Sequence, residues 1–354
     1  MQTIKPLDKS PTAANGNIAV NGHDGSALRA IVIDKIDAKI IKELRRHGVD
    51  VKDSPGMSRG ELLGEIGQYH ILIGRTRMPV DKEILEKGTN LRIVGRAAVG
   101  TDNIDFAAAE RNGVKVINAP GAATESVAEL ALTLTFMALR GVYNGSAMLK
   151  NGEFFKNSGV ELAGKTVGII GFGRIGSRFA EVLRPFNVNV IVNDIAKMNG
   201  RVKELGAEFV GMNELLARSD IISLHVNMEA NTKPVIDGSS FAMMKDGAIL
   251  INTVRAAAVD MHALQRSLAS GKLGFYASDV LWNEPPKDPK ELEIIAKDNV
   301  LITPHIGAQT NEAQGRVAEI MIPNLVEAIK ELKRPVYPAD NGDFVDRLEY
   351  HFIE

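Results

Sequence analysis

Short apolar runs alternate with amphipathic stretches along most of the chain. In its first part the apolar runs are Ala30–Ile33, His70–Gly74, Leu91–Gly95 and Val114–Asn118. Continuous runs of this length are typical of parallel strands that are buried on both faces. Because the stretches between them have helical spacing, the pattern predicts an α/β fold with helices on both faces of a parallel sheet.

Three helices stand out in this pattern. Over residues 37–47 the apolar side chains fall on one face and the charged ones on the other, and Gly48 follows as a C-cap. A longer helix is predicted over 122–148, as buried core, a domain connector or a dimer face. The last is predicted over 311–333, where Pro323 should cause a kink or a break.

A glycine-rich turn follows the apolar run that begins at Thr166. Gly171, Gly173 and Gly176 have the G-x-G-x-x-G spacing, a helical pattern follows, and a second apolar run ends at Asp194. Strand, glycine turn, helix, strand and acid are what a dinucleotide-binding βαβ unit requires. The three glycines allow the turn, the approach of the backbone to a pyrophosphate, and close helix packing.

The second half continues the alternation. Further strands are predicted at Ala207–Val210, Ile221–Val226, Ala248–Asn252, Leu273–Ala277 and Val300–Thr303. A length of 354 residues suggests two domains. Each half therefore has the plan of a doubly wound parallel sheet.

Composition narrows the class of protein. The formal net charge of −2 gives no reason to expect nucleic acid or an anionic membrane as partner. The absence of cysteine excludes disulfides and a thiolate metal site and fits a cytoplasmic protein; no metal site is predicted. No apolar run approaches the roughly 20 residues that span a bilayer. The polar residues 1–27 are expected to form a flexible tail.

Polar residues stand where the apolar runs end, which is where doubly wound sheets bind ligands. They are Arg75, Arg96, Asn118, Asp194, His225, Arg255, Asp279, Glu284 and His305. His305 is a candidate general acid/base, Glu284 a candidate partner that raises the pKa of that histidine, and Arg255 a candidate fork for a carboxylate. The alternatives are a loop histidine, a solvated acid and a strand-end salt bridge. Together the residues predict hydride transfer on an anionic 2-hydroxy or 2-keto acid.

Asp194 bears on the choice of cofactor. A carboxylate at the end of the second strand accepts both ribose hydroxyls of NAD and repels the 2′-phosphate of NADP. No basic residue follows it until Lys197. The sequence therefore favours NAD.

Several motifs resemble those of the D-2-hydroxyacid dehydrogenases, over roughly residues 28–333. They are Leu91–Asp105, Asn118–Pro120 with Ala128–Glu129, Gly171–Gly176, Asn252–Arg255, Asp279–Val280 with Glu284–Pro285, and Thr303–Gly307. The resemblance implies a Rossmann NAD-binding domain, residues 123–306, inserted in a smaller flavodoxin-like substrate domain, residues 28–122 and 307–354. It also implies a homodimer, and no serine-sensing domain after the last helix.

The resemblance also implies roles for single residues. Arg255, Glu284 and His305 fall on the catalytic positions, and Asp279 falls on that of the nicotinamide carboxamide. The remaining cofactor contacts fall on Gly171, Gly173, Arg174, Ile175, Gly176, Asp194, Val226, Thr253 and Val99. Substrate contacts fall on Arg75, Arg96, Ala98 and Gly100.

Arg75 and Arg96 match arginines of the branch of the family that oxidises D-3-phosphoglycerate. Two arginines that face the pocket would suit the phosphate of such a substrate. Glyoxylate or hydroxypyruvate reduction, and a non-enzymatic NAD-sensing corepressor, are the alternatives. Alanine also replaces residues that are frequent in the family, and the added methyls are expected to narrow the pocket. These alanines are Ala98, Ala123, Ala256 and Ala257.

Overall fold

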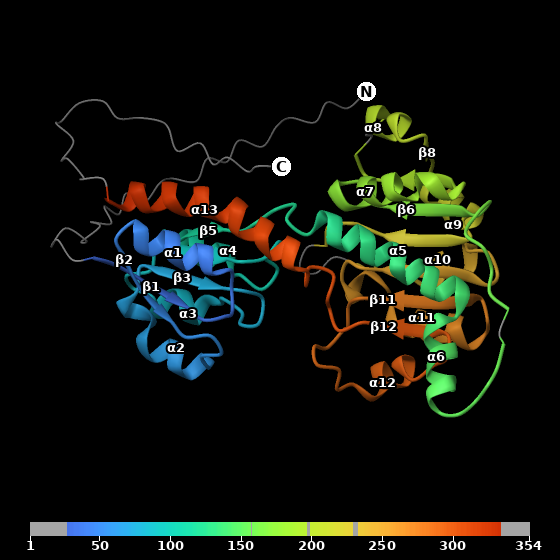
Figure 1. Ribbon diagram of the computed structural model, residues 1–354, viewed down its shortest axis with the longest axis horizontal. Helices are drawn as coiled ribbons and strands as arrows, with labels where there is room; N and C mark the ends of the chain where they lie inside the picture. The colour runs from blue at the N-terminus through green and yellow to red at the C-terminus, as the bar shows by residue number, and fades with distance from the viewer. Residues whose placement is uncertain (1–26, 157, 197–198, 229–232, 334–354) are drawn as a thin grey trace, which may run out of the picture.

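The computed structural model describes residues 27–156, 158–196, 199–228 and 233–333, which form two parallel sheets covered by helices (Figure 1). Of the expected tail only Ala27 lies in this part of the chain, and residues 334–354 of the expected substrate domain lie outside it. The prediction of two doubly wound parallel sheets is confirmed. The exact division at residues 122 and 306 stays a prediction.

The first sheet has the strand order β2-β1-β3-β4-β5. Its strands are β1 (Leu28–Val32), β2 (Val49–Asp53), β3 (Ile71–Gly74), β4 (Ile93–Arg96) and β5 (Lys115–Ile117). Alternate residues of β1 pack on opposite faces of the sheet. Ala30 and Val32 pack against α1 (Ala38–Arg46) and α13 (Asn311–Lys333), and Ile31 packs against the helices on the other face. The opposite helices are α2 (Arg59–Glu65), with the short 3₁₀ helix Ile66–Gln68 after it, α3 (Lys82–Lys87) and α4 (Phe106–Arg111).

Strand β2 was not among the predicted strands. It lies at the edge of the sheet, and buried and exposed residues alternate over its first three positions. An edge strand of this kind carries no continuous apolar run, and the run is the signal by which the other strands of the sheet were predicted.

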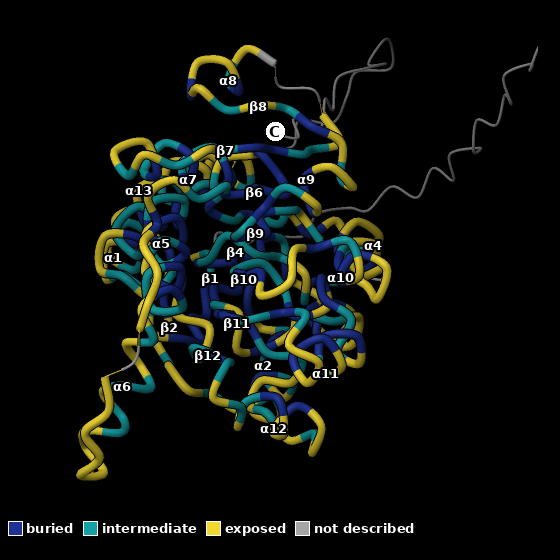
Figure 2. The backbone as a smooth tube through the Cα atoms, turned by 90° about the vertical axis from the view of Figure 1, so that its right-hand side faces the viewer, coloured by how far each residue is buried: buried dark blue, intermediate teal, exposed yellow. Residues whose placement is uncertain are grey.

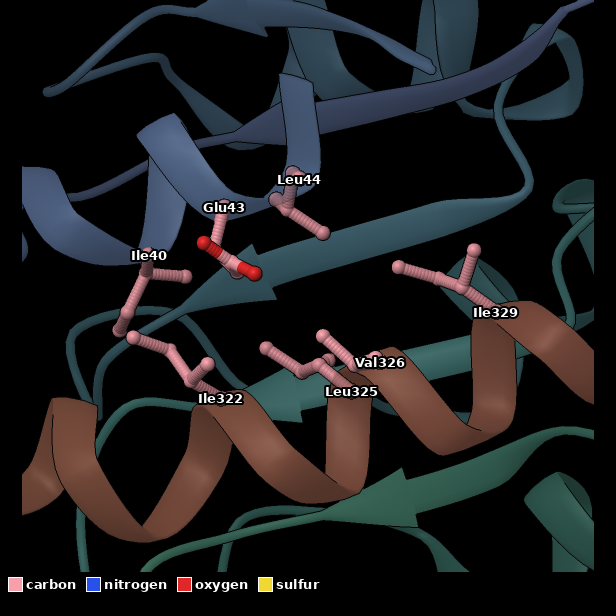
Figure 3. Close-up of a pocket in the computed structure, with 7 residues that line it drawn as sticks. All are labelled: Ile40, Glu43, Leu44, Ile322, Leu325, Val326 and Ile329. Carbon is pink, nitrogen blue, oxygen red and sulfur yellow. The ribbon is translucent and has the colours of Figure 1, made fainter. Parts of the chain in front are cut away.

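Helices α1 and α13 are far apart in the sequence but pack side by side on the first sheet (Figure 3). Ile40 and Leu44 of α1 meet Ile322, Leu325 and Ile329 of α13, and only a narrow crevice remains between them. The predicted helix is confirmed as α1: the Asp37 side chain accepts the backbone N–H of Lys39 at its start. The C-cap is His47, and Gly48, the predicted C-cap, follows it with a positive φ of 69°. Because α13 packs against α1, the last helix of the described chain belongs with the first sheet.

The second sheet has the strand order β12-β11-β10-β9-β6-β7-β8. Its strands are β6 (Thr166–Ile170), β7 (Asn189–Asn193), β8 (Glu208–Phe209), β9 (Ile221–Leu224), β10 (Ala248–Asn252), β11 (Leu273–Ser278) and β12 (Val300–Ile302). Strand β8 confirms the weak prediction at 207–210. One face packs against α9 (Met212–Arg218), α10 (Gly238–Met243), α11 (Met261–Ala269) and α12 (Pro289–Ile295), and the other against α5 (Thr124–Arg140), α7 (Arg174–Leu183) and α8 (Asn199–Glu204).

The single helix predicted over 122–148 is wrong. The chain forms α5 and then α6 (Val142–Lys150), which are bent by 65° relative to each other. Gly141 lies between them in the left-handed region, at φ 57°, and ends α5 as a C-cap. Within the described residues no single helix is long and apolar enough to cross a membrane; α5 and α6 pass that test only as a bent pair.

Of the kink or break predicted at Pro323, the break is wrong, because α13 runs as one helix from Asn311 to Lys333. The kink stays a prediction. Pro323 cannot donate the hydrogen bond that the carbonyl of Glu319 would accept. Both residues are exposed, so water can satisfy that carbonyl. The exposed side of the helix therefore tolerates the proline.

The chain crosses twice between the two sheets, and the crossings are joined by hydrogen bonds. Ser126 Oγ lies 2.8 Å from Thr310 Oγ1, and Arg316 Nε donates to the carbonyl of Ala122 at 2.8 Å. Figure 2 shows buried strands at the centre of the molecule, exposed helix surfaces around them, and α6 projecting from the body.

Candidate active site

The candidate residues gather between the two sheets, where loops after the carboxyl ends of their strands meet. Arg75, after β3, donates from Nη2 to Gln309 Oε1 at 3.0 Å. Arg255, after β10, donates from Nε to Asp102 Oδ2, after β4, at 2.9 Å. Residues from both sheets therefore line one region, as the sequence predicted for a ligand site.

The glycine turn leaves room where a dinucleotide would lie. A Cβ on Gly171, whose φ is 90°, would stand 2.6 Å from the backbone of His225, and a Cβ on Gly176 would stand 2.0 Å from the carbonyl oxygen of Gly171. By contrast, a Cβ on Gly173 would meet no protein atom within 4 Å. Gly173 is also the N-cap of α7 and has no side-chain cap, so the first N–H groups of that helix are available to an anion. The turn fits a pyrophosphate.

Two residues that follow strands of the same sheet, β7 and β10, complete this fit. Asp194 Oδ2 accepts the N–H of Phe172 at 2.5 Å and Oδ1 accepts the N–H of Ala196 at 2.8 Å, so its carboxylate is fixed beside the turn. Thr253 Oγ1, after β10, is buried without a hydrogen-bond partner in the described residues. Buried hydroxyls normally have a hydrogen-bond partner, and a bound ligand would supply one here.

The other predicted cofactor contacts come from both sheets. Arg174 and Ile175 are the first two residues of α7, and the Arg174 side chain reaches the crossing at Gly121. Val226, which follows β9, is half-buried against the core of the second sheet. Val99 comes from the first sheet, where its carbonyl accepts the Asn118 side-chain N–H at 2.8 Å.

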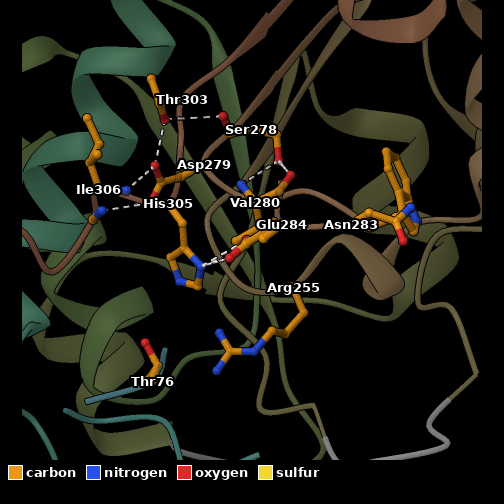
Figure 4. Close-up of polar contacts among 12 residues, drawn as sticks. Thr76, Arg255, Ser278, Asp279, Val280, Asn283, Glu284, Thr303, His305 and Ile306 are labelled. Carbon is orange, nitrogen blue, oxygen red and sulfur yellow. Dashed lines mark hydrogen bonds and ion pairs between the residues drawn. The ribbon is translucent and has the colours of Figure 1, made fainter. Parts of the chain in front are cut away.

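His305 and Glu284 form a pair (Figure 4). His305 Nδ1 lies 3.0 and 3.1 Å from the two carboxylate oxygens of Glu284. A carboxylate can only accept, so Nδ1 carries the proton, and the lone pair of a neutral ring is on Nε2. Both side chains are partly open to solvent, and Nε2 has no partner among the described residues. The pair is arranged to take up and release a proton at Nε2.

Buried carboxylates hold the loops that carry this pair. Glu291 of α12 is fully buried and accepts the N–H of Trp282 at 2.7 Å and the side-chain N–H of Asn283 at 3.0 Å, next to Glu284. Asp279, 2% exposed, accepts the backbone N–H groups of Ile306 and Gly307, the two residues that follow His305.

Asp279 makes contacts beyond the predicted one with the nicotinamide, which stays a prediction. Both of its carboxylate oxygens are bound by the loop over 303–307, with Thr303 Oγ1 donating at 2.6 Å. Burial raises the pKa of Asp279 above its ordinary value, although these hydrogen bonds oppose the change. The structure thus gives Asp279 a part in fixing His305, whose φ is 55°.

The two substrate arginines differ in environment. Arg75 is half-buried and bonded to Gln309. Arg96 is 2% exposed, and its Nε and Nη2 have no hydrogen-bond partner in the described residues, while Nη1 makes a long contact of 3.4 Å with the carbonyl of Met78. Burial lowers the pKa of Arg96, and the charges of Asp34 and Asp102 partly oppose this. Ala98, in the loop that follows β4, is half-buried.

His225 directly follows β9 and lies in the core, not in the site. It is 9% exposed, Nε2 lies 2.9 Å from Ser223 Oγ, and the ring packs against Phe179 with centroids 5.2 Å apart. Burial lowers the pKa of His225 to about 3, so the ring is neutral at physiological pH.

Sequence reasoning gave no role to three residues that the structure brings into the site. They are Asp102, Gln309 and Glu291. Asp102 lies inside the motif 91–105, so its position carried a signal, but its partner Arg255 is 153 residues away. Glu291 has no such signal, because an acid in a helix is normally a solvated residue.

Comparisons with known proteins agree with this arrangement. A family model described as the NAD-binding domain of D-isomer-specific 2-hydroxyacid dehydrogenases matches residues 132–307. A hydroxypyruvate reductase of Thermotoga maritima is 39% identical over 291 residues, which cover 82% of this chain and 94% of that protein. A D-3-phosphoglycerate dehydrogenase of Archaeoglobus fulgidus is 37% identical over 328 residues, or 92% of this chain. The chain spans only 62% of the length of that second relative.

Solved structures with a similar fold are also reductases and dehydrogenases of 2-hydroxy or 2-keto acids. A glyoxylate reductase from Paecilomyes thermophila superposes with a TM-score of 0.77 at 31% identity, over 86% of this chain and 96% of that one. A D-lactate dehydrogenase from Aquifex aeolicus, solved with NAD and lactic acid, gives a TM-score of 0.74 at 27% identity, over 86% of this chain and 97% of that one.

Proposed function

This chain belongs to the family of D-isomer-specific 2-hydroxyacid dehydrogenases, with NAD as its cofactor, and we propose that it oxidises D-3-phosphoglycerate to 3-phosphohydroxypyruvate for serine synthesis. The observation that carries the proposal is the meeting of the His305–Glu284 pair and Arg255 (Figure 4). An acid/base, its carboxylate partner and a carboxylate anchor are what oxidation of a 2-hydroxy acid needs.

The proposed roles follow from the geometry. His305 Nε2 takes the proton of the C2 hydroxyl, and Glu284 stabilises the imidazolium that forms. Arg255 binds the substrate carboxylate and orients C2. The hydride acceptor is supplied by NAD when it is bound. The residues Gly171, Gly173, Gly176, Asp194 and Thr253 would hold it.

The phosphorylated substrate is supported by the arginines of the first sheet. Two guanidinium nitrogens of Arg96 have no partner among the described residues, and Arg75 directly follows the neighbouring strand β3. A phosphate has enough acceptor oxygens for both. An unphosphorylated acid would leave the unpaired nitrogens of Arg96 unused.

The second candidate is a hydroxypyruvate or glyoxylate reductase on the same fold. Relatives with those names are 39% and 36% identical to this chain, close to the 37% of the phosphoglycerate dehydrogenase. Steady-state kinetics with D-3-phosphoglycerate, phosphohydroxypyruvate, hydroxypyruvate and glyoxylate, each with NAD(H) and NADP(H), separates the two. A higher kcat/KM for glyoxylate or hydroxypyruvate than for the phosphorylated pair would refute the first candidate.

Arg96 offers a sharper test of the phosphate site. Replacement by methionine keeps a long, unbranched side chain and removes its charge, so it leaves a smaller cavity than alanine would. We expect Arg96→Met to raise KM for the phosphorylated substrate and to spare hydroxypyruvate. Arg218→Ala, which removes a surface ion pair on α9, serves as control. Equal effects on both substrates would place Arg96 outside the phosphate site.

An NAD-sensing corepressor is the alternative from another class of protein. Its one supporting feature, the polar N-terminal tail, lies outside the described residues. Removal of residues 1–26 tests it: unchanged turnover and unchanged partner binding would leave the corepressor without support. The cytoplasmic location likewise stays a prediction.

A homodimer is supported by α6 and the segment after it. These residues expose large apolar side chains, among them Tyr143, Leu149, Phe154 and Phe155, and α6 stands away from the body (Figure 2). A second copy of the chain would cover them. Light scattering should give twice the chain mass of 38.3 kDa, and Leu149→Glu with Phe154→Glu should reduce it to the monomer. A monomeric wild type would refute this.

A further inference from the structure

Arg255 is held from the opposite sheet by one carboxylate. Asp102 Oδ2 accepts from Nε at 2.9 Å and also from Nη2, and Nη1 donates to the carbonyl of Val254 at 2.6 Å. Asp102 follows β4 and Arg255 follows β10, so this ion pair joins the first sheet to the second.

The pair leaves part of the guanidinium free. An arginine has five N–H donors, and Asp102 takes the edge formed by Nε and Nη2. The carbonyl of Val254 takes one N–H of Nη1. One N–H on Nη1 and one on Nη2 therefore remain without a partner among the described residues, and a second carboxylate can bind them.

Gly100 makes room for this arrangement. A Cβ on Gly100 would stand 2.8 Å from Arg255 Nη2 and 3.4 Å from Asp102 Oδ2. Any larger residue would push the guanidinium away from its carboxylate. The chain near Asp102 therefore supplies both the partner of Arg255 and the space that it occupies.

We propose that Asp102 is a positioning residue for Arg255: it holds one edge of the guanidinium from the first sheet so that the remaining N–H groups of Nη1 and Nη2 meet the substrate carboxylate. The proposal rests on the proposed function, because it takes Arg255 as the carboxylate anchor. It adds that the anchor is correctly oriented only when the two sheets are as close as they are here. Asp102 acts through Arg255 and touches neither substrate nor cofactor.

The first test is Asp102→Asn, which keeps the shape of the side chain and removes its charge. Because the pair is partly exposed, we expect kcat/KM for the acid that wild type turns over best to fall by about tenfold, mainly through a higher KM. The affinity for NADH, measured by fluorescence titration, should stay within about twofold, since Asp102 is not placed at the cofactor. Asp246→Asn is the matched control, because its carboxylate pairs with Lys272 at 2.8 Å ahead of β10, at the end of that strand away from Arg255.

A second pair of variants separates positioning from a general structural role. Lysine has no planar fork to orient, so Asp102→Asn should have little further effect in an Arg255→Lys background. An equal fall in both backgrounds would overturn the proposal, and so would a lower KM in Asp102→Asn, which would make Asp102 a competitor of the substrate. Gly100→Ala should reproduce the fall by displacing Arg255.

The outcomes also separate this proposal from the proposed function. An active wild type whose Asp102→Asn variant is equally active overturns the positioning role alone. A wild type that turns over no 2-hydroxy or 2-keto acid overturns the proposed function and the positioning role with it.

Discussion

The buried His225 should make the second domain sensitive to acid. Burial lowers the pKa of this ring to about 3 in the folded protein, from 6.5 for the unfolded chain. Between these two values the unfolded state binds one more proton than the folded state, so the stability due to the neutral ring is lost as pH falls below 6.5. From pH 7 to pH 5 the expected loss is about 2 kcal/mol.

The assay follows urea unfolding through the fluorescence of Trp282, the single tryptophan of the chain, which packs against the core of the second sheet. His225→Gln removes the titrating group and keeps a donor or acceptor near Ser223 Oγ. All other titrating groups are shared by the two proteins. The free energy of unfolding of the wild type should therefore fall by about 2 kcal/mol more than that of the variant between pH 7 and pH 5. Equal falls would refute the assignment of a neutral, acid-resistant His225.

The remaining predictions concern the site. His305→Ala should lower kcat by at least about 100-fold and leave NAD affinity unchanged, as judged by rapid kinetics and fluorescence titration; retained turnover would remove His305 from proton transfer. Asp194→Ala should reduce the preference for NAD in kcat/KM; an unchanged NAD/NADP ratio means that another residue sets it. Gly173→Ala should fold normally but bind NAD weakly, because its Cβ would meet no protein atom. Gly176→Ala should lower the melting temperature, because its Cβ would clash with the carbonyl oxygen of Gly171. Calorimetry on both glycine variants checks this.

Much of the fold could be predicted because the second sheet is buried on both faces. Its long strands are continuous apolar runs, which are the strongest signal that a strand can carry. The failures are local. β2 lies at an edge and lacks such a run, and the end of α5 depends on one glycine in the left-handed region. Pro323 is tolerated because it faces solvent, and that orientation is a tertiary property.

The site was predictable in its members but not in its contacts. Polar residues at strand ends indicate which side chains meet, since parallel strands end at one edge of a sheet. The partners that fix them come from other elements: Glu291 from a helix, Asp102 from the other sheet. Those pairings depend on how loops and domains pack, and the sequence pattern of a single element does not contain that information.

In the proposed function, Arg96 is the residue on which the choice of substrate depends. Arg96 is 2% exposed, and its Nε and Nη2 have lost their hydration without gaining a hydrogen bond from the described residues. Each unsatisfied buried donor costs about 1–3 kcal/mol, and the lowered pKa of Arg96 expresses the same cost of burial. A second anionic group on the substrate would offset that cost on binding, which glyoxylate cannot do with its single carboxylate on Arg255. The unpaired arginine therefore favours a substrate with two anionic ends, and the loss of this advantage in Arg96→Met is its measurable consequence.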